Sequence, residues 1–358
     1  MNAPPPTPSA ADRPLLERCG RLRDYWYVAC TAAELRDRPL GRVILEEALV
    51  VFRDPQGRPA VLRDRCLHRN AMLSEGELEG GCLRCPYHGW TFDARGSCVR
   101  IPSEGPDCAL PKERVPRYPA REQDGLVWVW MGAGAPDKEP FPMPHWDEPG
   151  WGAYYMVTSF ENDVTNCAEN FMDVPHTVFV HKGWFRSTTR KQIRAVVERT
   201  PDSVLVTYHQ PQDTIGFSGF VLNPRREPMV HTDRFYLPNM TRVDYDFGSR
   251  RSFIITSHCT PVSDLRTQVY TLISFRLGNR LLNALGQRLL PPYTREVIHQ
   301  DVVIMRNQGR SLERYGADFR NSPCDVIHRY IESLREHEAR GADGPGPRPQ
   351  TTEVDFFV

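Results

Sequence analysis

The chain has 358 residues, which is enough for two or three domains with buried cores. Its 45 lysines and arginines balance 45 aspartates and glutamates, and no block of like charges occurs, so binding of nucleic acid through a basic surface is not expected. The longest nearly uncharged apolar stretch, Gly125 to Ala135, is about half as long as the roughly 20 residues that cross a bilayer. No membrane span is predicted.

The beginning of the chain, Met1 to Ala11, is rich in proline and alanine and is predicted to be disordered. It has neither the basic start nor the apolar run of a signal peptide, so a cytoplasmic location is expected. Asp137 to Gly150 combines prolines with charge and lacks periodicity, which is typical of a connection between domains. The predicted organisation is a disordered tail, a first domain, a second domain and a C-terminal tail, over residues 1–20, 21–140, 141–340 and 341–358.

Short strands are predicted throughout the first domain. Val43 to Phe52 is a β-prone run, and it is followed by the turn residues Asp54 to Gly57 and a second run, Ala60 to Leu62. This order predicts a hairpin. Leu126 to Trp130 predicts a further strand.

The second domain mixes strands with helices. Ser252 to Cys259 and Thr267 to Phe275 are strongly β-prone and are predicted to be adjacent strands of one antiparallel sheet. Helical spacing appears in four segments, which are Asn166–Asp173, Arg280–Leu290, Thr294–Gln308 and Cys324–Arg340. The predicted fold class is therefore α+β.

Two short segments of the first domain each carry a thiol and an imidazole. Cys66-Leu67-His68 is followed, after sixteen residues, by Cys85-Pro86-Tyr87-His88. In one kind of [2Fe–2S] cluster two histidines replace two cysteines on one iron, which raises the reduction potential. A structural zinc site is the alternative, because Cys82-x-x-Cys85 with Cys66 and one histidine also supplies four ligands. The cluster is favoured because each segment pairs one cysteine with one histidine.

A second set of candidate ligands lies at the start of the second domain. His176 and His181 are five residues apart, which on a continuous helix turns them about 140° from each other. They can share a metal only if the helix ends or bends, and Pro175 provides such a disruption. Asn170, Asp173 and His176 follow one another at intervals of three and share a face.

The third ligand of this set is predicted to be Asp301, which lies on the apolar face of the predicted helix Thr294–Gln308. An unpaired buried carboxylate costs several kcal/mol or loses its charge, so a partner is expected. His176, His181 and Asp301 would form the two-histidine, one-carboxylate triad of non-heme Fe(II) sites. Glu296 is the rival ligand, and an arginine partner for Asp301 is the structural alternative.

The two cysteine and histidine segments, Cys66 to Arg69 and Cys85 to Trp90, closely resemble the cluster loops of Rieske proteins. The family usually has proline where this chain has Leu67, and often glycine where it has Asn70. Together with the motif Asn-x-x-Asp-x-x-His-x-x-x-x-His and the late aspartate, the arrangement from about Trp26 to Gln308 resembles the oxygenase subunit of Rieske non-heme iron oxygenases.

This resemblance implies an N-terminal all-β Rieske domain and a C-terminal helix-grip (START-like) catalytic domain, in which a curved antiparallel sheet wraps around helices. By the resemblance, Cys66 and Cys85 would hold one iron of the [2Fe–2S] cluster, and His68 and His88 the other. Relatives are homotrimers in which the cluster of one subunit reduces the catalytic iron of its neighbour through an aspartate.

Asp173 occupies the position that matches this bridging aspartate, and Asn170 matches a residue that supports the iron ligands. The Asn-x-x-Asp spacing and the single type of chain are similar to the monooxygenase and demethylase branch of the family, represented by vanillate demethylase and pheophorbide oxygenase. A ring cis-dihydroxylating dioxygenase is the alternative within the family. A Rieske electron-transfer protein or a ligand carrier without oxygenase activity is the alternative outside it.

The reaction implied is the hydroxylation or demethylation of a small apolar aromatic or alicyclic substrate by dioxygen. Electrons would come from NAD(P)H through a separate ferredoxin and/or flavin reductase, because no Gly-x-Gly-x-x-Gly fingerprint follows a strand here. Ile215 to Leu222 is a candidate for the rim of the substrate pocket, and a surface hairpin is the alternative.

Overall fold

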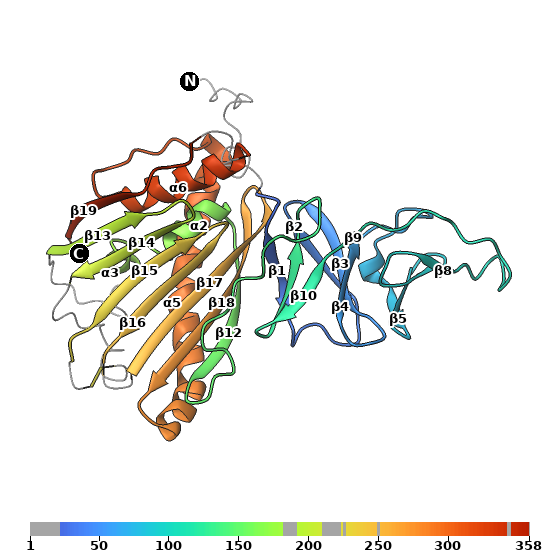
Figure 1. Ribbon diagram of the computed structural model, residues 1–358, viewed down its shortest axis with the longest axis horizontal. Coiled ribbons are helices and arrows are strands. Elements are labelled where there is room, and N and C mark those ends of the chain that lie inside the picture. Colours follow the sequence, from blue (N-terminus) through green and yellow to red (C-terminus); the bar gives the residue numbers. More distant parts are fainter. Residues whose placement is uncertain are drawn as a thin grey trace, which may run out of the picture. The chain divides into compact units, whose positions relative to one another are not determined.

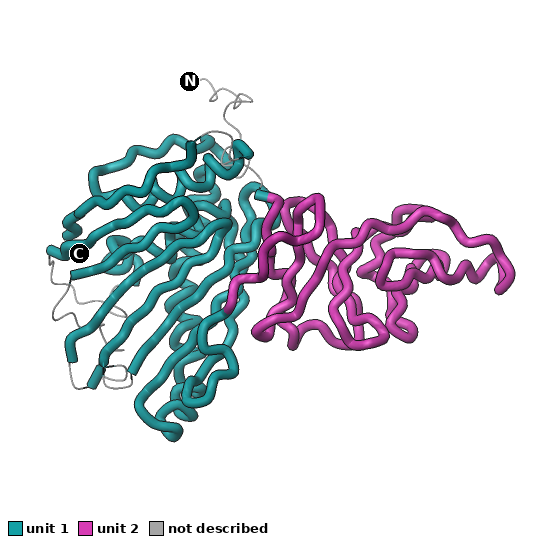
Figure 2. The backbone as a smooth tube through the Cα atoms, viewed as in Figure 1, with its two compact units in different colours: residues 1–22, 143–358 teal, residues 23–142 magenta. Residues whose placement is uncertain are grey.

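The computed structural model describes residues 22–181, 192–209, 223–224, 227–248, 251–341 and 345–357. Its backbone divides into two units, one formed by Arg23–Pro142 and the other containing Met143–Val358 (Figure 2). This division falls within the predicted connection. The predicted disordered tail lies outside the described residues.

The unit Arg23–Pro142 is built from short antiparallel strands. Its first sheet has the order β1-β11-β10 and consists of β1 (Trp26–Thr31), β11 (Leu126–Trp130) and β10 (Ala120–Gln123). The second has the order β2-β3-β4-β9 and consists of β2 (Leu40–Ile44), β3 (Glu47–Arg53), β4 (Pro59–Arg63) and β9 (Arg117–Tyr118). The third has the order β5-β6-β7-β8 and consists of β5 (Glu77–Glu79), β6 (Cys82–Arg84), β7 (Thr91–Phe92) and β8 (Cys98–Arg100). A 3₁₀ turn, η2 (Leu73–Glu75), precedes β5.

The predicted hairpin is present as β3 and β4, and the predicted strand Leu126–Trp130 coincides with β11. The prediction of one strand over 43–52 is wrong, because the chain turns between β2 and β3 at Leu45 and Glu46. Both residues have positive φ angles, 52° and 63°, as a two-residue type I′ hairpin requires. Neither is a usual turn residue, so the turn was not visible in the sequence.

The cysteine-containing loops rest on a buried core between the second and third sheets. This core includes Phe52, Leu83 and Phe92 together with Cys66 and Cys85. Because the two cysteines are part of the core, their loops have a rigid base.

In the described part of the other unit, one antiparallel sheet has the order β12-β18-β17-β16-β15-β14-β13-β19 (Figure 1). Its strands are β12 (Gly152–Phe160), β13 (Gln192–Arg199), β14 (Ser203–His209), β15 (Val230–Tyr236), β16 (Met240–Asp246), β17 (Arg251–Ser263), β18 (Arg266–Leu277) and β19 (Gln350–Phe357). The helices are α2 (Val164–Asn170), α3 (Thr177–Val180), α5 (Arg280–Tyr315) and α6 (Val326–Ala339). Figure 1 shows α5 behind the middle of the sheet and α6 beside β13 and β19. The predicted α+β fold class is confirmed.

The two predicted adjacent strands are confirmed as β17 and β18, which pair antiparallel. The two helices predicted over 280–290 and 294–308 are instead one helix, α5, which contains Pro291 and Pro292. The prolines cannot bond to the carbonyls of Gln287 and Arg288, but both of these residues are exposed, so water can satisfy the carbonyls. The helix therefore continues past the prolines, and Asp301 lies on this regular part of α5, beside the sheet.

The prediction that residues 341–358 form a tail is wrong for Gln350–Phe357, which are the edge strand β19 and pair with β13. Val354 and Phe356 face the core with 8% and 2% exposure. They alternate with the less buried Glu353 and Asp355, as expected of a strand with one buried face. Within the described residues, no helix is long and apolar enough to cross a membrane.

Candidate functional site

The two predicted cluster loops have the same backbone design. The amide of Cys66 donates to the carbonyl of Ala71 at 2.9 Å, and the amide of Cys85 donates to the carbonyl of Trp90 at 2.8 Å. Each bond closes a loop that begins at the cysteine and includes the histidine. The two loops therefore present their ligands from similar frames, although one has the histidine two residues and the other three residues after the cysteine.

Each loop also contains one residue in the left-handed conformation. Asn70 has φ 62° and Gly89 has φ 73°, and the amide of each donates to the carbonyl of the cysteine four residues earlier at 3.1 Å. A Cβ atom on Gly89 would lie 3.0 Å from Pro102 Cγ, so that position has little room for a side chain. Asparagine tolerates the left-handed region better than most residues, which explains how Asn70 serves where glycine is more usual.

The thiols and the imidazoles of the loops differ in burial. Cys66 and Cys85 are 1% and 3% exposed, whereas His88 is exposed and His68 is half-buried. The two imidazole rings lie 4.6 Å apart, and the ring of His68 stacks on Trp90 at 4.8 Å. The histidine end of the site therefore faces the surface, where an electron can enter or leave.

The hydrogen bonding of these groups fits metal ligands. Burial raises the pKa of the Cys66 thiol to about 11, whereas the backbone amides of His68 and Arg69 donate to its sulfur and act to lower that pKa. These amides stabilise a thiolate, which is the form that binds iron. Nδ1 of His68 is buried and has no hydrogen-bond partner in the described part of the chain, so it is available as a ligand.

The positions of the cysteines and histidines in these loops do not suit a single zinc ion. A tetrahedral site needs all of its ligand atoms close together around one ion. Among the described residues, one His/Cys/Asp/Glu group has ligand atoms that all lie within 4.8 Å of one another, and it does not include Cys66, Cys82 or Cys85. Two buried thiols and two outer imidazoles that do not converge on one point suit a two-iron cluster.

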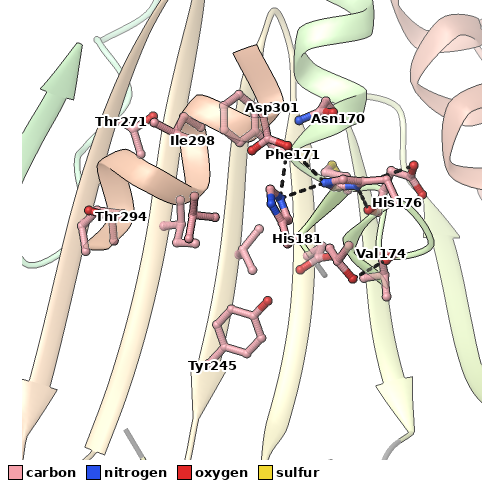
Figure 3. A pocket seen from close by; sticks show the side chains of 18 of the residues that line it. Asn170, Phe171, Val174, His176, His181, Tyr245, Thr271, Thr294, Ile298 and Asp301 are labelled. Atoms are coloured by element: carbon pink, nitrogen blue, oxygen red, sulfur yellow. Dashed lines mark hydrogen bonds and ion pairs between the residues drawn. The ribbon is translucent and has the colours of Figure 1, made fainter. Parts of the chain in front are cut away.

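The group that does converge is His176, His181 and Asp301 (Figure 3). His176 immediately precedes the single-turn helix α3 and His181 immediately follows it, while Asp301 projects from α5. The two Nε2 atoms are 3.3 Å apart, and they lie 3.4 Å and 3.2 Å from Asp301 Oδ1. The condition that no long continuous helix carries both histidines is met, because α3 spans only the four residues between them.

These separations fit three ligands of one metal ion. Ligand atoms about 2.1 Å from an ion and 3.2–3.4 Å from each other subtend angles of about 100°, so they occupy one face and leave the opposite face open. Oδ1 of Asp301 is buried and has no hydrogen-bond partner in the described chain, which is the state expected of a metal ligand.

Hydrogen bonds outside the triad orient both imidazoles. Nδ1 of His176 donates to the backbone carbonyl of Asp173, and Nδ1 of His181 donates to Oε1 of Gln300 at 2.9 Å. Because both acceptors are oxygens that carry no hydrogen, each Nδ1 holds the proton and each Nε2 holds the lone pair for the metal. Gln300 was missed in the sequence, where its position beside Asp301 was the only signal.

The charges of the triad also favour a bound cation. Burial acts to raise the pKa of Asp301, but the neighbouring imidazoles of His176 and His181 outweigh it and lower that pKa. The carboxylate is therefore ionised at neutral pH. The rivals do not fit: Glu296 is exposed, and Arg306 pairs with Glu161 at 2.9 Å.

The triad opens into a cavity of about 110 Å³, which we call the active-site cavity. Asn170 and Asp173 lie on its lining, and Figure 3 shows Asn170 beside Asp301 and His176. Most of the other lining side chains are apolar, among them Met156, Phe171, Val243, Phe253, Ile255 and Ile273. The predicted rim segment, Ile215–Leu222, lies outside the described residues.

Comparison with known proteins identifies both halves of the chain. Residues 25–119 match the Rieske [2Fe-2S] domain, and residues 161–328 match the vanillate O-demethylase oxygenase C-terminal domain. This chain belongs to the Rieske oxygenases. The Rieske domain implies a [2Fe–2S] cluster, and the oxygenase family uses a mononuclear iron and dioxygen, so the predicted cofactors are confirmed. The assignment of individual ligands stays a prediction.

Three relatives illustrate the similarity. The toluene-4-sulfonate monooxygenase system iron-sulfur subunit TsaM1 of Comamonas testosteroni is 35% identical over 182 residues, covering 50% of this chain and 52% of the relative. The dicamba O-demethylase oxygenase component of Stenotrophomonas maltophilia is 38% identical over 164 residues, covering 45% and 48%. The crystal structure of dicamba monooxygenase bound to 3,6-dichlorosalicylic acid has a TM-score of 0.77 and 25% identity, covering 89% of this chain and 99% of that chain.

The alignments with the curated relatives span about half of the length of those relatives. The comparisons therefore support the two domains and the cofactors that these domains imply. The reaction, the substrate and the partners of this chain are matters for proposal.

Proposed function

We propose that this chain is the oxygenase component of a monooxygenase that hydroxylates or demethylates a small apolar aromatic or alicyclic substrate. The observation that supports the proposal most strongly is the position of the triad. His176, His181 and Asp301 face one another at 3.2–3.4 Å, and they lie on the wall of a mostly apolar cavity.

The metal-binding roles follow from the two sets of side chains. Cys66, Cys85, His68 and His88 would hold the [2Fe–2S] cluster, and the triad would hold the mononuclear iron. When bound, that iron activates dioxygen for insertion into a C–H bond.

The protein residues hold the substrate near the metal and keep water away from it. The apolar lining of the active-site cavity excludes water, while the bonds from Nδ1 of His176 and His181 keep both rings in place. Hydroxylation of a carbon bonded to oxygen or nitrogen collapses to demethylation, so the two reactions differ in the substrate and not in the site.

Asp173 is proposed to bridge the cluster of a neighbouring subunit to His176 in a homotrimer. Its carbonyl oxygen accepts from Nδ1 of His176, and its carboxylate lies 3.7 Å from the same nitrogen. The side chain is 49% exposed, so its outer side remains available to another subunit. Asn170, on the cavity lining, is proposed to support the iron ligands.

Electrons are proposed to come from NAD(P)H through a separate ferredoxin and/or flavin reductase. The sequence contains no dinucleotide-binding fingerprint after a strand, which supports binding of NAD(P)H by a separate protein. A cytoplasmic location stays a prediction.

Oxygen uptake with a surrogate reductase tests the proposal. A screen of methoxylated and alkylated aromatic and alicyclic compounds should find substrates that stimulate uptake, and one atom of labelled dioxygen should appear in the organic product or the released aldehyde. A reducible cluster with no compound stimulating uptake would favour an electron-transfer protein or a ligand carrier.

Ring dihydroxylation is the second candidate, because curated relatives of this chain also include dioxygenase subunits. The same experiment separates the two reactions. A dioxygenase would place both labelled oxygen atoms on one ring as a cis-diol.

A further inference from the structure

Three buried polar side chains lie on the face of the sheet that faces the helices and the active-site cavity. Tyr208 belongs to β14, while His231 and Asp233 belong to the neighbouring strand β15. Their exposed fractions are 4%, 1% and 1%. We call them the anchor cluster. Of the three, Asp233 lies on the lining of the active-site cavity, together with Tyr245 of β16.

Hydrogen bonds and ring stacking hold the carboxylate of Asp233 in one orientation. Its Oδ1 accepts from Nε2 of His231 at 2.9 Å, and its Oδ2 accepts from the hydroxyl of Tyr208 at 2.9 Å. The ring of His231 is stacked between Tyr208 at 4.3 Å and Tyr245 at 4.4 Å. Figure 3 shows Tyr245 beside the cavity, below His181.

The anchor cluster is rich in acceptors. Since Nε2 of His231 donates to Asp233, a neutral imidazole keeps its lone pair at Nδ1, and that atom is buried with no hydrogen-bond partner among the described residues. A proton on Nδ1 would be buried without an acceptor, which is unfavourable. Burial and the charge of Asp233 raise the pKa of Tyr208, so its hydroxyl keeps the proton that it donates.

The carboxylate can accept one more donor. A carboxylate has about four lone-pair sites, and two of those on Asp233 are occupied. Its place on the cavity lining means that a ligand in the cavity can use the remaining capacity. The anchor cluster is thus a rigid hydrogen-bond acceptor on the sheet side of the cavity, while the triad would hold the metal on the helix side.

The charges around the cavity disfavour an anionic ligand. Asp173, Asp233 and Asp301 line the cavity, and the described part of its lining contains no lysine or arginine. These three carboxylates outnumber the two positive charges of the Fe(II) that the triad would hold, so an aryl carboxylate or sulfonate would be desolvated in a negatively charged site without a lysine or arginine partner among the described lining residues. The relative named for toluene-4-sulfonate therefore gives poor guidance to the substrate of this chain.

We propose that Asp233, held by Tyr208 and His231, determines substrate specificity by accepting a hydrogen bond from an amine, amide N–H or phenolic hydroxyl of the substrate. Aryl carboxylates and sulfonates are disfavoured. The inference rests on the proposed function, because the same cavity holds the carbon that is oxidised.

Anaerobic binding of matched ligands to the iron-loaded protein tests the proposal. The probes are 4-methoxyaniline and 4-methoxyphenol, which carry a donor, anisole, which carries none, and 4-methoxybenzoate, which is an anion. Calorimetry should give at least about tenfold tighter binding of the two donor ligands than of anisole, because hydrogen bonds to charged groups have that effect or a larger one. The benzoate should bind more weakly than anisole.

Asp233→Asn removes the charge and keeps the shape of the side chain. The preference for donors over anisole should fall to within about threefold, and the benzoate should bind about tenfold better than to the parent. Asp244→Asn is the matched control. Asp244 lies on β16 between the inward-facing Val243 and Tyr245, so it points away from the cavity, where it pairs with Arg242 at 2.7 Å. This control should retain the parental preference.

Tyr208→Phe provides a second variant that does not depend on the folding of Asp233→Asn. It removes one hydrogen bond that holds the carboxylate, so the donor preference should change while the affinity for anisole stays the same. The proposal is overturned if the benzoate binds as tightly as the aniline, or if these variants leave the parental preference unchanged. Because binding is measured without turnover, a failure of the proposed oxygenase reaction appears separately, as a reducible cluster without stimulated oxygen uptake.

Discussion

Replacement of Gln300 by alanine should weaken retention of the mononuclear iron and leave the cluster intact. The side chain accepts one hydrogen bond, from Nδ1 of His181 at 2.9 Å, and His181 is only 4% exposed. A neutral hydrogen bond contributes about 1 kcal/mol, which corresponds to about fivefold in affinity. Loss of a partner that orients a metal ligand costs about 10- to 100-fold. We therefore expect iron affinity to fall by about 5- to 100-fold.

Release of iron to a chelator under anaerobic conditions measures this effect, with the visible spectrum of the cluster as an internal standard. Gln287→Ala is the matched control, because Gln287 lies on the same helix and donates to the carbonyl of Ala153 at 2.7 Å, away from the triad. Its iron release should equal that of the parent. If Gln300→Ala releases iron at the parental rate, the orienting role of Gln300 is wrong.

Three further predictions concern electron transfer, pH and stability. Asp173→Ala should keep both metal sites loaded, because His176 bonds to the backbone carbonyl of residue 173 and not to its side chain. Substrate-coupled reoxidation of the reduced cluster, followed by stopped-flow spectroscopy, should slow by about 100-fold. A parental rate would contradict the bridging role of Asp173. Burial acts to lower the pKa of His176, but Asp301 and Asp173 outweigh it and raise that pKa, so protons compete with the metal from a pH above the usual 6.5. Anaerobic titration of the iron-depleted site with Fe(II) should therefore show binding that weakens as the pH falls through this raised value. An affinity that is constant down to pH 5 would refute the assignment of His176 as a ligand. Phe356→Ala should lower the free energy of unfolding by about 3 kcal/mol, because the side chain is 2% exposed in the core; an unchanged urea midpoint would mean that β19 does not pack as described.

The candidate ligand sets could be proposed from the sequence because the chemistry they would support depends on short spacings. The cysteine and histidine pairs of the cluster loops, and the histidines that flank α3, each lie within a few residues of one another. Asp301 was found by a different signal, since a carboxylate on an apolar helix face needs a partner.

Features that depend on the tertiary environment could not be predicted. The long helix α5 survives Pro291 and Pro292 because the affected carbonyls face solvent, and this exposure is decided by packing. Residues 350–357 become a strand because β13 offers them an edge. The anchor cluster was missed as well, since the pairing of Tyr208 with His231 depends on the register of two strands. The inward-facing alternation of His231, Asp233 and Phe235 was its only signal.

The most direct test of the two-site account is the iron and acid-labile sulfide content of His176→Ala beside the parent. The parent should contain about three irons and two sulfides per chain, and the variant about two of each with an unchanged cluster spectrum. A variant that keeps the full iron content, or that loses cluster and single iron together, would contradict the account.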